Sequence, residues 1–259
     1  MTHVLVMAKA PVAGRVKTRL CPPCTPAEAA AVAEAALADT LDAVARCGAD
    51  RLLVALDGAP GPWLPPGFGV FPQCEGPFDR RLAHAWSVAG GPGVQIGMDT
   101  PQVAAADLDG ALAALGKAGA VLGHAADGGW WAIGLHRPDP AVFLGVPMSR
   151  ADTGRRQEAR LRSLGLRVAK LAELVDVDRI EDLAEVVRAA PQSRTAHVAR
   201  RLGPRALGST PGGSACAADG ASAAGAAGEP GGAGSARRSC AAGAQPPERR
   251  SVRNAEAVP

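Results

Sequence analysis

The sequence has very few aromatic residues. Tyrosine is absent from its 259 residues, and aromatic residues make up 3% of the chain. Proteins that bind single-stranded nucleic acid without sequence preference stack the bases on aromatic side chains. The formal net charge of +3 argues neither for nor against a nucleic-acid partner. Acidic and basic residues are interspersed over about the first 200 positions, so no extended basic face is predicted there. We therefore expect no nucleic-acid partner.

Long apolar runs are also lacking. No stretch approaches the roughly 20 apolar residues of a membrane-spanning helix, and the N-terminus lacks the basic segment, apolar core and cleavage site of a signal peptide. Of the six cysteines, Cys21 and Cys24 form a C-x-x-C pair, without a second pair or a histidine at the spacing of a zinc site. We expect ordinary loop cysteines, no membrane span and a cytoplasmic protein.

Among the motifs that are present, the first is a cationic loop. The apolar run at residues 4–7 predicts a buried strand, and residues 8–20 (A-K-A-P-V-A-G-R-V-K-T-R-L) follow it. Backbone N–H groups and cations after a strand are a common way to hold phosphate, although neither the P-loop nor the G-x-G-x-x-G pattern is present. A phosphate-binding loop and a solvated basic turn both fit. The loop contains a proline, a glycine and three cations: Pro11, Gly14, Arg15, Lys17 and Arg19.

Strands and helices alternate along residues 1–202. This order predicts an α/β fold of three layers, with a mostly parallel central sheet between helices. Residues 203–259 are dominated by Gly, Ala, Ser and Pro, and we expect a disordered tail because such a segment cannot bury enough apolar surface. The expected strands are 3–7, 51–56, 70–71, 93–97, 120–123, 130–135 and 167–171, and the expected helices are 26–46, one within 73–88, 104–117, 152–164 and 180–189.

Several aspartates follow predicted strands, where parallel sheets bind ligands. Asp99 suits Mg²⁺, which prefers one or two carboxylates together with phosphate oxygens, although it could instead cap the next helix. Asp178 could be a second metal ligand or the N-cap of the helix at 180–189, and Asp176 competes with it for the metal. Asp127, in an Asp-Gly-Gly connection, fits a tight turn as well as a catalytic or acceptor-binding role.

These motifs together resemble a family of little-characterised bacterial GT-A-like transferases, often labelled glycosyltransferases or transferases associated with radical-SAM and seleno-domain genes. The resemblance covers roughly residues 3–190. Departures include Met98 in place of a serine, and Arg179-Ile180 in place of Thr-Pro. The matching segments are residues 8–20, 25–41, 73–82 (Q-C-E-G-P-F-D-R-R-L), 96–101 (I-G-M-D-T-P), 120–135 (A-V-L-G-H-A-A-D-G-G-W-W-A-I-G-L) and 176–183 (D-V-D-R-I-E-D-L).

The resemblance implies the GT-A, or nucleotide-diphospho-sugar transferase, fold, close to small nucleotidyltransferases such as the molybdenum-cofactor guanylyltransferases. It implies a divalent metal, Mg²⁺ or Mn²⁺, on Asp99 and Asp178. We expect catalytic roles for Asp99, Asp127 and Lys17. The partners would be a nucleotide sugar or a nucleoside triphosphate, and a small acceptor. Nucleotide binding would fall to Ala8, Ala10, Pro11, Gly14, Arg15, Lys17, Arg19 and Arg81.

From the sequence we expect a Mg²⁺-dependent transferase that uses a nucleotide-activated donor. Our first expectation is that it passes a sugar from a nucleotide sugar to a small acceptor. There are two alternatives. The protein could transfer a nucleotidyl group and release pyrophosphate, or it could be a nucleotide-binding module without catalytic activity. The same cationic loop and metal would serve all three, so the motifs do not choose between them.

Overall fold

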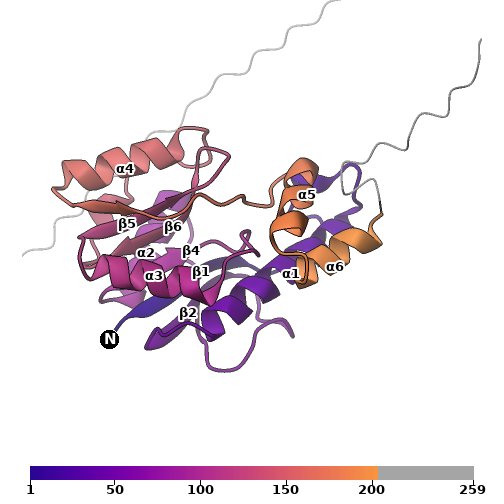
Figure 1. The fold of residues 1–259 in the computed structure, drawn as a ribbon, viewed down its shortest axis with the longest axis horizontal. Helices are drawn as coiled ribbons and strands as arrows, with labels where there is room; N and C mark the ends of the chain where they lie inside the picture. The colour runs from indigo at the N-terminus through magenta and orange to yellow at the C-terminus, as the bar shows by residue number, and fades with distance from the viewer. Residues whose placement is uncertain (204–259) are drawn as a thin grey trace, which may run out of the picture. The chain divides into compact units, whose positions relative to one another are not determined.

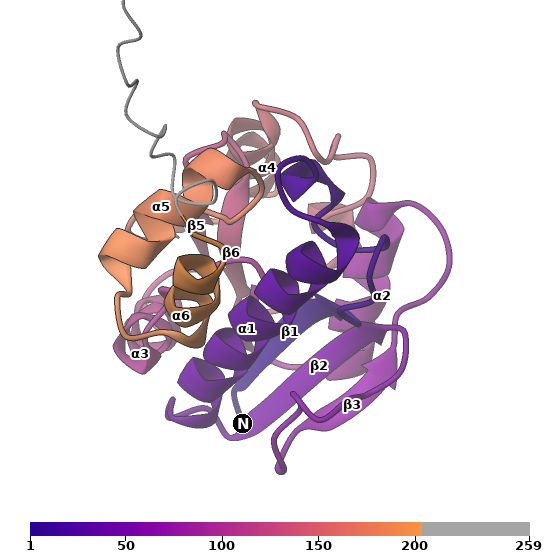
Figure 2. The same ribbon diagram turned by 90° about the vertical axis from the view of Figure 1, so that its right-hand side faces the viewer.

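The computed structural model describes residues 1–203, whose core is one seven-stranded sheet in the order β3-β2-β1-β4-β6-β5-β7 (Figures 1 and 2). Strand β6 is antiparallel to β4 and β5, and every other neighbouring pair is parallel. The strands are β1 (His3–Lys9), β2 (Arg51–Asp57), β3 (Gly69–Pro72), β4 (Gly93–Ile96), β5 (Ala120–His124), β6 (Trp130–Leu135) and β7 (Val168–Lys170).

Helices cover both faces of this sheet. Helices α1 and α3 pack on one face and α2 and α4 on the other, while α5 and α6 lie beside α1 (Figures 1 and 2). The predicted α/β fold with a mostly parallel sheet between helices is therefore confirmed. The helices are η1 (Thr18–Leu20), α1 (Pro26–Ala45), α2 (Phe78–Ala89), α3 (Ala105–Leu115), η2 (Pro140–Val142), α4 (Thr153–Ser163), α5 (Ile180–Ala189) and α6 (Arg194–Arg201).

Strand β1 lies at the centre and is buried on both faces. Val4 and Val6 point into the core cluster under α1 and α3, whereas Leu5 and Met7 point into the cluster under α2 and α4. A parallel strand between two helical layers needs apolar residues on both sides, which explains the uninterrupted apolar run in the sequence.

Helix α1 is also enclosed on two sides. It begins at a capping box in which Thr25 and Glu28 exchange side-chain and backbone hydrogen bonds, as the sequence predicts. Leu37 faces the sheet, and Val32 faces a third core cluster that includes residues of α5 and α6. Burial on both sides accounts for an alanine-rich helix that is apolar nearly all round.

The expected tight turn, at residues 125–129, joins β6 directly to β5, so β6 runs antiparallel within the mostly parallel sheet. One helix differs from the sequence expectation. Helix α6 was not predicted at all. Ser193 is its N-cap, and a distant carboxylate adds to its first turn: Asp39 of α1 accepts hydrogen bonds from the backbone N–H groups of Arg194 and Thr195.

The tail expected at 203–259 lies outside the described residues, apart from Gly203. Within residues 1–203, none of the helices combines the length and the apolar character needed to cross a membrane.

Candidate functional site

A cavity of about 430 Å³ opens at the edge of the sheet where the parallel strands end. A smaller cavity of about 230 Å³ adjoins it, next to the cationic loop. Four residues line both cavities: Lys9, Met98, Asp99 and Asp178. This is the edge at which ligands of α/β sheets bind, as the positions of the aspartates predicted.

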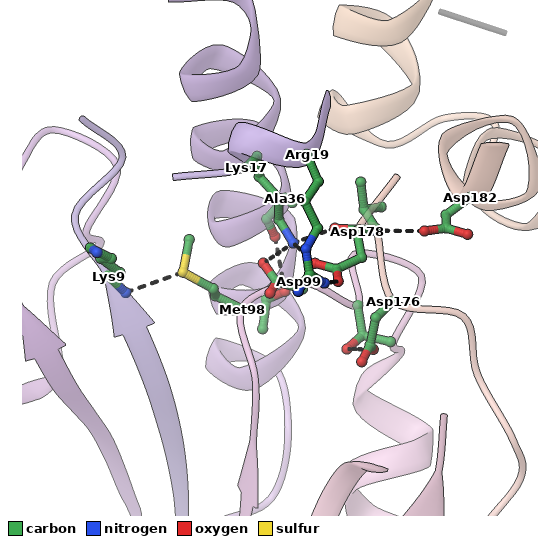
Figure 3. Close-up of polar contacts among 12 residues, drawn as sticks. Lys9, Lys17, Arg19, Ala36, Met98, Asp99, Asp176, Asp178 and Asp182 are labelled. Carbon is green, nitrogen blue, oxygen red and sulfur yellow. Dashed lines mark hydrogen bonds and ion pairs between the residues drawn. The ribbon is translucent and has the colours of Figure 1, made fainter. Parts of the chain in front are cut away.

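Lys17 forms the centre of the polar contacts between the cavities. Its ammonium lies 2.9 Å from Oδ1 of Asp99 and 3.6 Å from Oδ1 of Asp178, and it also donates to the carbonyl oxygen of Val177 (Figure 3). The side chain is only 6% exposed. Its backbone has a φ of 47°, a left-handed conformation that non-glycine residues seldom adopt and that concentrates at functional sites.

Asp178 is held by cations rather than used as a helix cap. A guanidinium nitrogen of Arg19 pairs with its carboxylate, beside the ammonium of Lys17 (Figure 3). The carboxylate of Asp182 accepts hydrogen bonds from the backbone N–H groups of Asp178 and Arg179, at 3.0 and 2.7 Å, and so caps α5 instead. The interpretation of Asp178 as the N-cap is therefore wrong, and its carboxylate faces the cavities.

Asp176 is a third carboxylate at the same place, and it is partly buried. It accepts a hydrogen bond of 3.1 Å from the hydroxyl of Thr100. Burial, together with the negative charge of Asp99, raises the pKa of Asp176 to about 7. The backbone N–H of Val177 donates to the carbonyl of Asp99 at 2.8 Å, which fixes the segment with Asp176 and Asp178 against the end of β4.

Strand β1 is fastened to β4 by a contact that the sequence did not predict. The backbone N–H of Lys9 donates to the sulfur of Met98 at 3.1 Å (Figure 3). The ammonium of Lys9 is 3.8 Å from a carboxylate oxygen of Asp57, at the end of β2. Met98 stands where the resembled family has a serine, and here it helps to place Asp99 beside the cationic loop.

The turn between β5 and β6 contributes Asp127 to the larger cavity. Oδ1 of Asp127 accepts from the backbone N–H of Gly129 at 2.7 Å, so this residue shapes the turn while it lines the cavity. Of the two tryptophans that follow, Trp131 is buried in the core and Trp130 is only partly buried. Both line the cavity, with Trp130 as the more exposed wall.

Gln73 and Arg81 form a further wall of the larger cavity. Nη1 of Arg81 donates to the amide oxygen of Gln73 at 2.9 Å. We missed Gln73 as a site residue, although the segment 73–82 that contains it was among the resembling motifs. A glutamine at the end of a short strand carries no signal of its own without the neighbouring strands.

The predicted nucleotide-binding residues do not all line the two cavities. Ala8 and Arg81 line the larger cavity, and Arg15, Lys17 and Arg19 line the smaller one. The other three, Ala10, Pro11 and Gly14, line neither of these two cavities. Gly14 instead has a φ of 77°, which identifies it as a turn residue.

The carboxylates fit a divalent cation only in part. Within the part of the chain that the structure describes, no group of three or more His, Cys, Asp or Glu side chains is arranged to hold a metal. Asp99 and Asp178, however, converge on one cation, the ammonium of Lys17. Because Mg²⁺ usually takes one or two carboxylates and completes its shell with water and phosphate oxygens, this pair is sufficient for a metal brought in with a nucleotide.

The chain is similar to known proteins in sequence and in fold. Residues 28–150 match the family described as "Uncharacterized protein conserved in bacteria (DUF2064)". A proposed nucleotide-diphospho-sugar transferase from Desulfovibrio desulfuricans G20 is similar in structure, with a TM-score of 0.73 and 26% identity over 80% of this chain and 97% of that chain. No curated protein sequence matches the chain.

Two more distant structures are a manganese complex of Rv0371c from Mycobacterium tuberculosis H37Rv and a cytidylyltransferase from Leptospira borgpetersenii. The first has a TM-score of 0.43 and 23% identity over 72% of this chain and 98% of that chain. The second has a TM-score of 0.48 and 12% identity over 81% and 98%. The similarity to the Desulfovibrio structure confirms the predicted resemblance, and the chain has the fold of the nucleotide-diphospho-sugar transferases.

Proposed function

We propose that this protein is a Mg²⁺-dependent transferase that moves a sugar from a nucleotide sugar to a small acceptor. The observation that carries the proposal is the convergence of Asp99 and Asp178 on Lys17, with Arg19 also paired to Asp178, where two cavities meet at the edge of the sheet. Anionic and cationic groups side by side suit a diphosphate and its metal. The similarity to a proposed nucleotide-diphospho-sugar transferase supports the same reaction class.

The chain's own groups have separate tasks in this proposal. Asp99 and Asp178 would hold the metal, which would supply positive charge to the departing diphosphate. Lys17 and Arg19 would turn from these carboxylates to the phosphate oxygens and stabilise the charge that develops as the bond to the sugar breaks. Asp127, across the larger cavity, would accept the proton of the acceptor hydroxyl.

Nucleotidyl transfer is the second candidate, and the smaller cavity favours it. That cavity is lined by Arg15, Lys17 and Arg19 and offers cationic surroundings for a third phosphate. In this reaction an oxygen of the acceptor would attack the α-phosphorus of a nucleoside triphosphate, and pyrophosphate would leave with the bond's electron pair. The same residues would neutralise the leaving group.

One experiment separates these functions. The full chain is incubated with Mg²⁺, a panel of nucleotide sugars and nucleoside triphosphates and a mixture of small acceptors, and nucleoside diphosphate and pyrophosphate are assayed separately. Release of nucleoside diphosphate from a nucleotide sugar supports glycosyl transfer. Release of pyrophosphate alone contradicts it and supports nucleotidyl transfer. Metal-dependent binding with neither product identifies a nucleotide-binding module.

A further inference from the structure

Two neighbouring side chains, Phe78 and Gln73, hold the guanidinium of Arg81 in place. Its guanidinium carbon lies 4.9 Å from the centre of the Phe78 ring, and its Nη1 donates to Gln73. The amide nitrogen of Gln73 in turn donates to the carbonyl oxygens of Ala8 and Ala55, at 2.8 and 2.9 Å. Because these bonds anchor Gln73 to two central strands, they also fix the guanidinium in one orientation.

The fixed guanidinium has a donor left over. Among the residues that the structure describes, Nε of Arg81 is buried and has no hydrogen-bond partner. An unpaired buried donor is unfavourable, and more so on a charged group, so native structures seldom leave one without a water or a ligand that accepts from it. With Nη1 engaged by Gln73, the Nε and Nη2 edge remains, and this fork matches the two oxygens of a carboxylate or phosphate.

The cavity also provides an apolar wall. Phe78, Trp130 and Met148 are partly buried, pack against the same core cluster, and line the cavity together with Arg81. A ligand that fills this region would place an apolar or planar body against these side chains and its anionic group on the arginine. Such a wall of apolar side chains with one oriented polar group is the usual composition of a small-molecule site.

Arg81 was expected among the nucleotide-binding residues, but the donor nucleotide has other cations to bind its phosphates. Its anionic groups are its phosphates, and the cations matched to them in the proposed function are Arg15, Lys17 and Arg19 of the smaller cavity, which Arg81 does not line. Resting on the proposed function, we propose that Arg81 is the oxyanion subsite for the second substrate. That substrate is a small acceptor carrying a carboxylate or phosphate beside an apolar body.

The test uses phenyl phosphate as the probe, with benzyl alcohol as its neutral counterpart, and measures binding to the full chain by isothermal titration calorimetry. Arg81→Gln should weaken phenyl phosphate binding at least tenfold, and Arg81→Lys should weaken it less because lysine keeps the charge but not the fork. Arg80→Gln is the matched control. Arg80 is the preceding residue of α2, exposed and outside both cavities, and its change should leave the affinity as it was.

Three results would overturn the proposal. These are no measurable binding of phenyl phosphate, equal affinity for benzyl alcohol, or an unchanged affinity in both Arg81 variants. The thermal unfolding of each variant is recorded first, and the comparison rests on Arg81→Lys if Arg81→Gln does not fold.

A second arm identifies the source of the oxyanion. The titration is repeated with saturating nucleoside diphosphate and Mg²⁺, and phenyl phosphate should bind as before. Competition between the two would show that Arg81 takes a phosphate of the nucleotide, which contradicts a second-substrate subsite. Binding of phenyl phosphate through Arg81 by a chain that binds no nucleotide would contradict the transferase proposal and leave the oxyanion site standing.

Discussion

The replacement Lys17→Met removes the cation on which the site's carboxylates converge. Methionine keeps nearly the length and the apolar stem of lysine, so the change mainly deletes the charge. Without it, Asp99 and Asp178 lose their shared ammonium, and Asp176 nearby has lost a neighbouring positive charge. We expect a less stable protein in the absence of divalent cations.

The size of the loss follows from the exposure of the partners. At 2.9 Å and an effective dielectric constant of about 20, a pair of unit charges attracts by about 6 kcal/mol before the desolvation cost is subtracted. Breaking a fully buried pair costs about 3–5 kcal/mol, whereas an exposed pair contributes less than about 1. The lysine is 6% exposed and the aspartates are 37% exposed, so the pair lies between these limits. A loss of about 2 kcal/mol corresponds to a Tm lower by about 4–8 °C for a domain of this size.

The assay is thermal unfolding of the wild type and the variant in chelator and in millimolar Mg²⁺. The variant should regain more stability from Mg²⁺ than the wild type does, because the ammonium no longer occupies the position between the carboxylates. Lys9→Met is the matched control: its ammonium is 3.8 Å from Asp57, both side chains are more than a third exposed, and its Tm should change by no more than about 2 °C. A Lys17→Met protein as stable as the wild type, or one indifferent to Mg²⁺, would refute this account of the site.

Three other predictions concern the fold that supports the site. His3 is buried against Trp86, and burial together with the charge of Arg51 lowers its pKa from 6.5 to about 4. His3 takes up a proton near pH 6.5 in the unfolded chain but only near pH 4 in the folded one. The free energy of unfolding should therefore fall by up to about 3 kcal/mol as the pH drops from about 6.5 to about 4. In urea titrations, His3→Leu should lack this part of the pH dependence. Asp39→Ala should lower the free energy of unfolding by about 2 kcal/mol, because this carboxylate, only 9% exposed, accepts hydrogen bonds from the first turn of α6. The backbone amides of α6 should then exchange hydrogen faster. Gly128→Ala should lower the free energy of unfolding by more than about 2 kcal/mol in the same titrations, because Gly128 has a φ of 86° and the new Cβ would lie 1.9 Å from the carbonyl oxygen of Ala151. A variant that unfolds like the wild type would be inconsistent with this turn.

The layers of the fold could be predicted because local patterns decide them. The apolar run of β1, the capping box at Thr25 and the Asp-Gly turn after β5 each depend on neighbours in the sequence. Helix α6 escaped prediction because its residues are mostly polar: Ser193 is its local N-cap, and the other contact of its first turn is with Asp39, 155 residues earlier than Arg194. A contact of that range leaves no periodic pattern in the sequence.

The sequence predicted which charged residues belong to the candidate site, but not how they contact one another. Asp99, Lys17 and Arg19 were named from strand ends and from the cationic loop, and the structure brings their charged groups together through Asp178. What could not be predicted is that Lys17 is nearly enclosed, since enclosure depends on where residues 175–178 return to β4. The roles of Ala10, Pro11 and Gly14 in binding a nucleotide stay predictions.

In the proposed function, Asp99 holds a divalent metal together with a nucleotide diphosphate. Calorimetric titration of the wild type and of Asp99→Asn with nucleoside diphosphates, in Mg²⁺ and in chelator, tests this role. Asparagine preserves the shape of the side chain and removes its charge, and the thermal unfolding of both proteins is compared first. We predict that the wild type binds more tightly in Mg²⁺ than in chelator, and that Asp99→Asn loses this difference. A folded Asp99→Asn protein that keeps the full Mg²⁺ dependence would contradict the account.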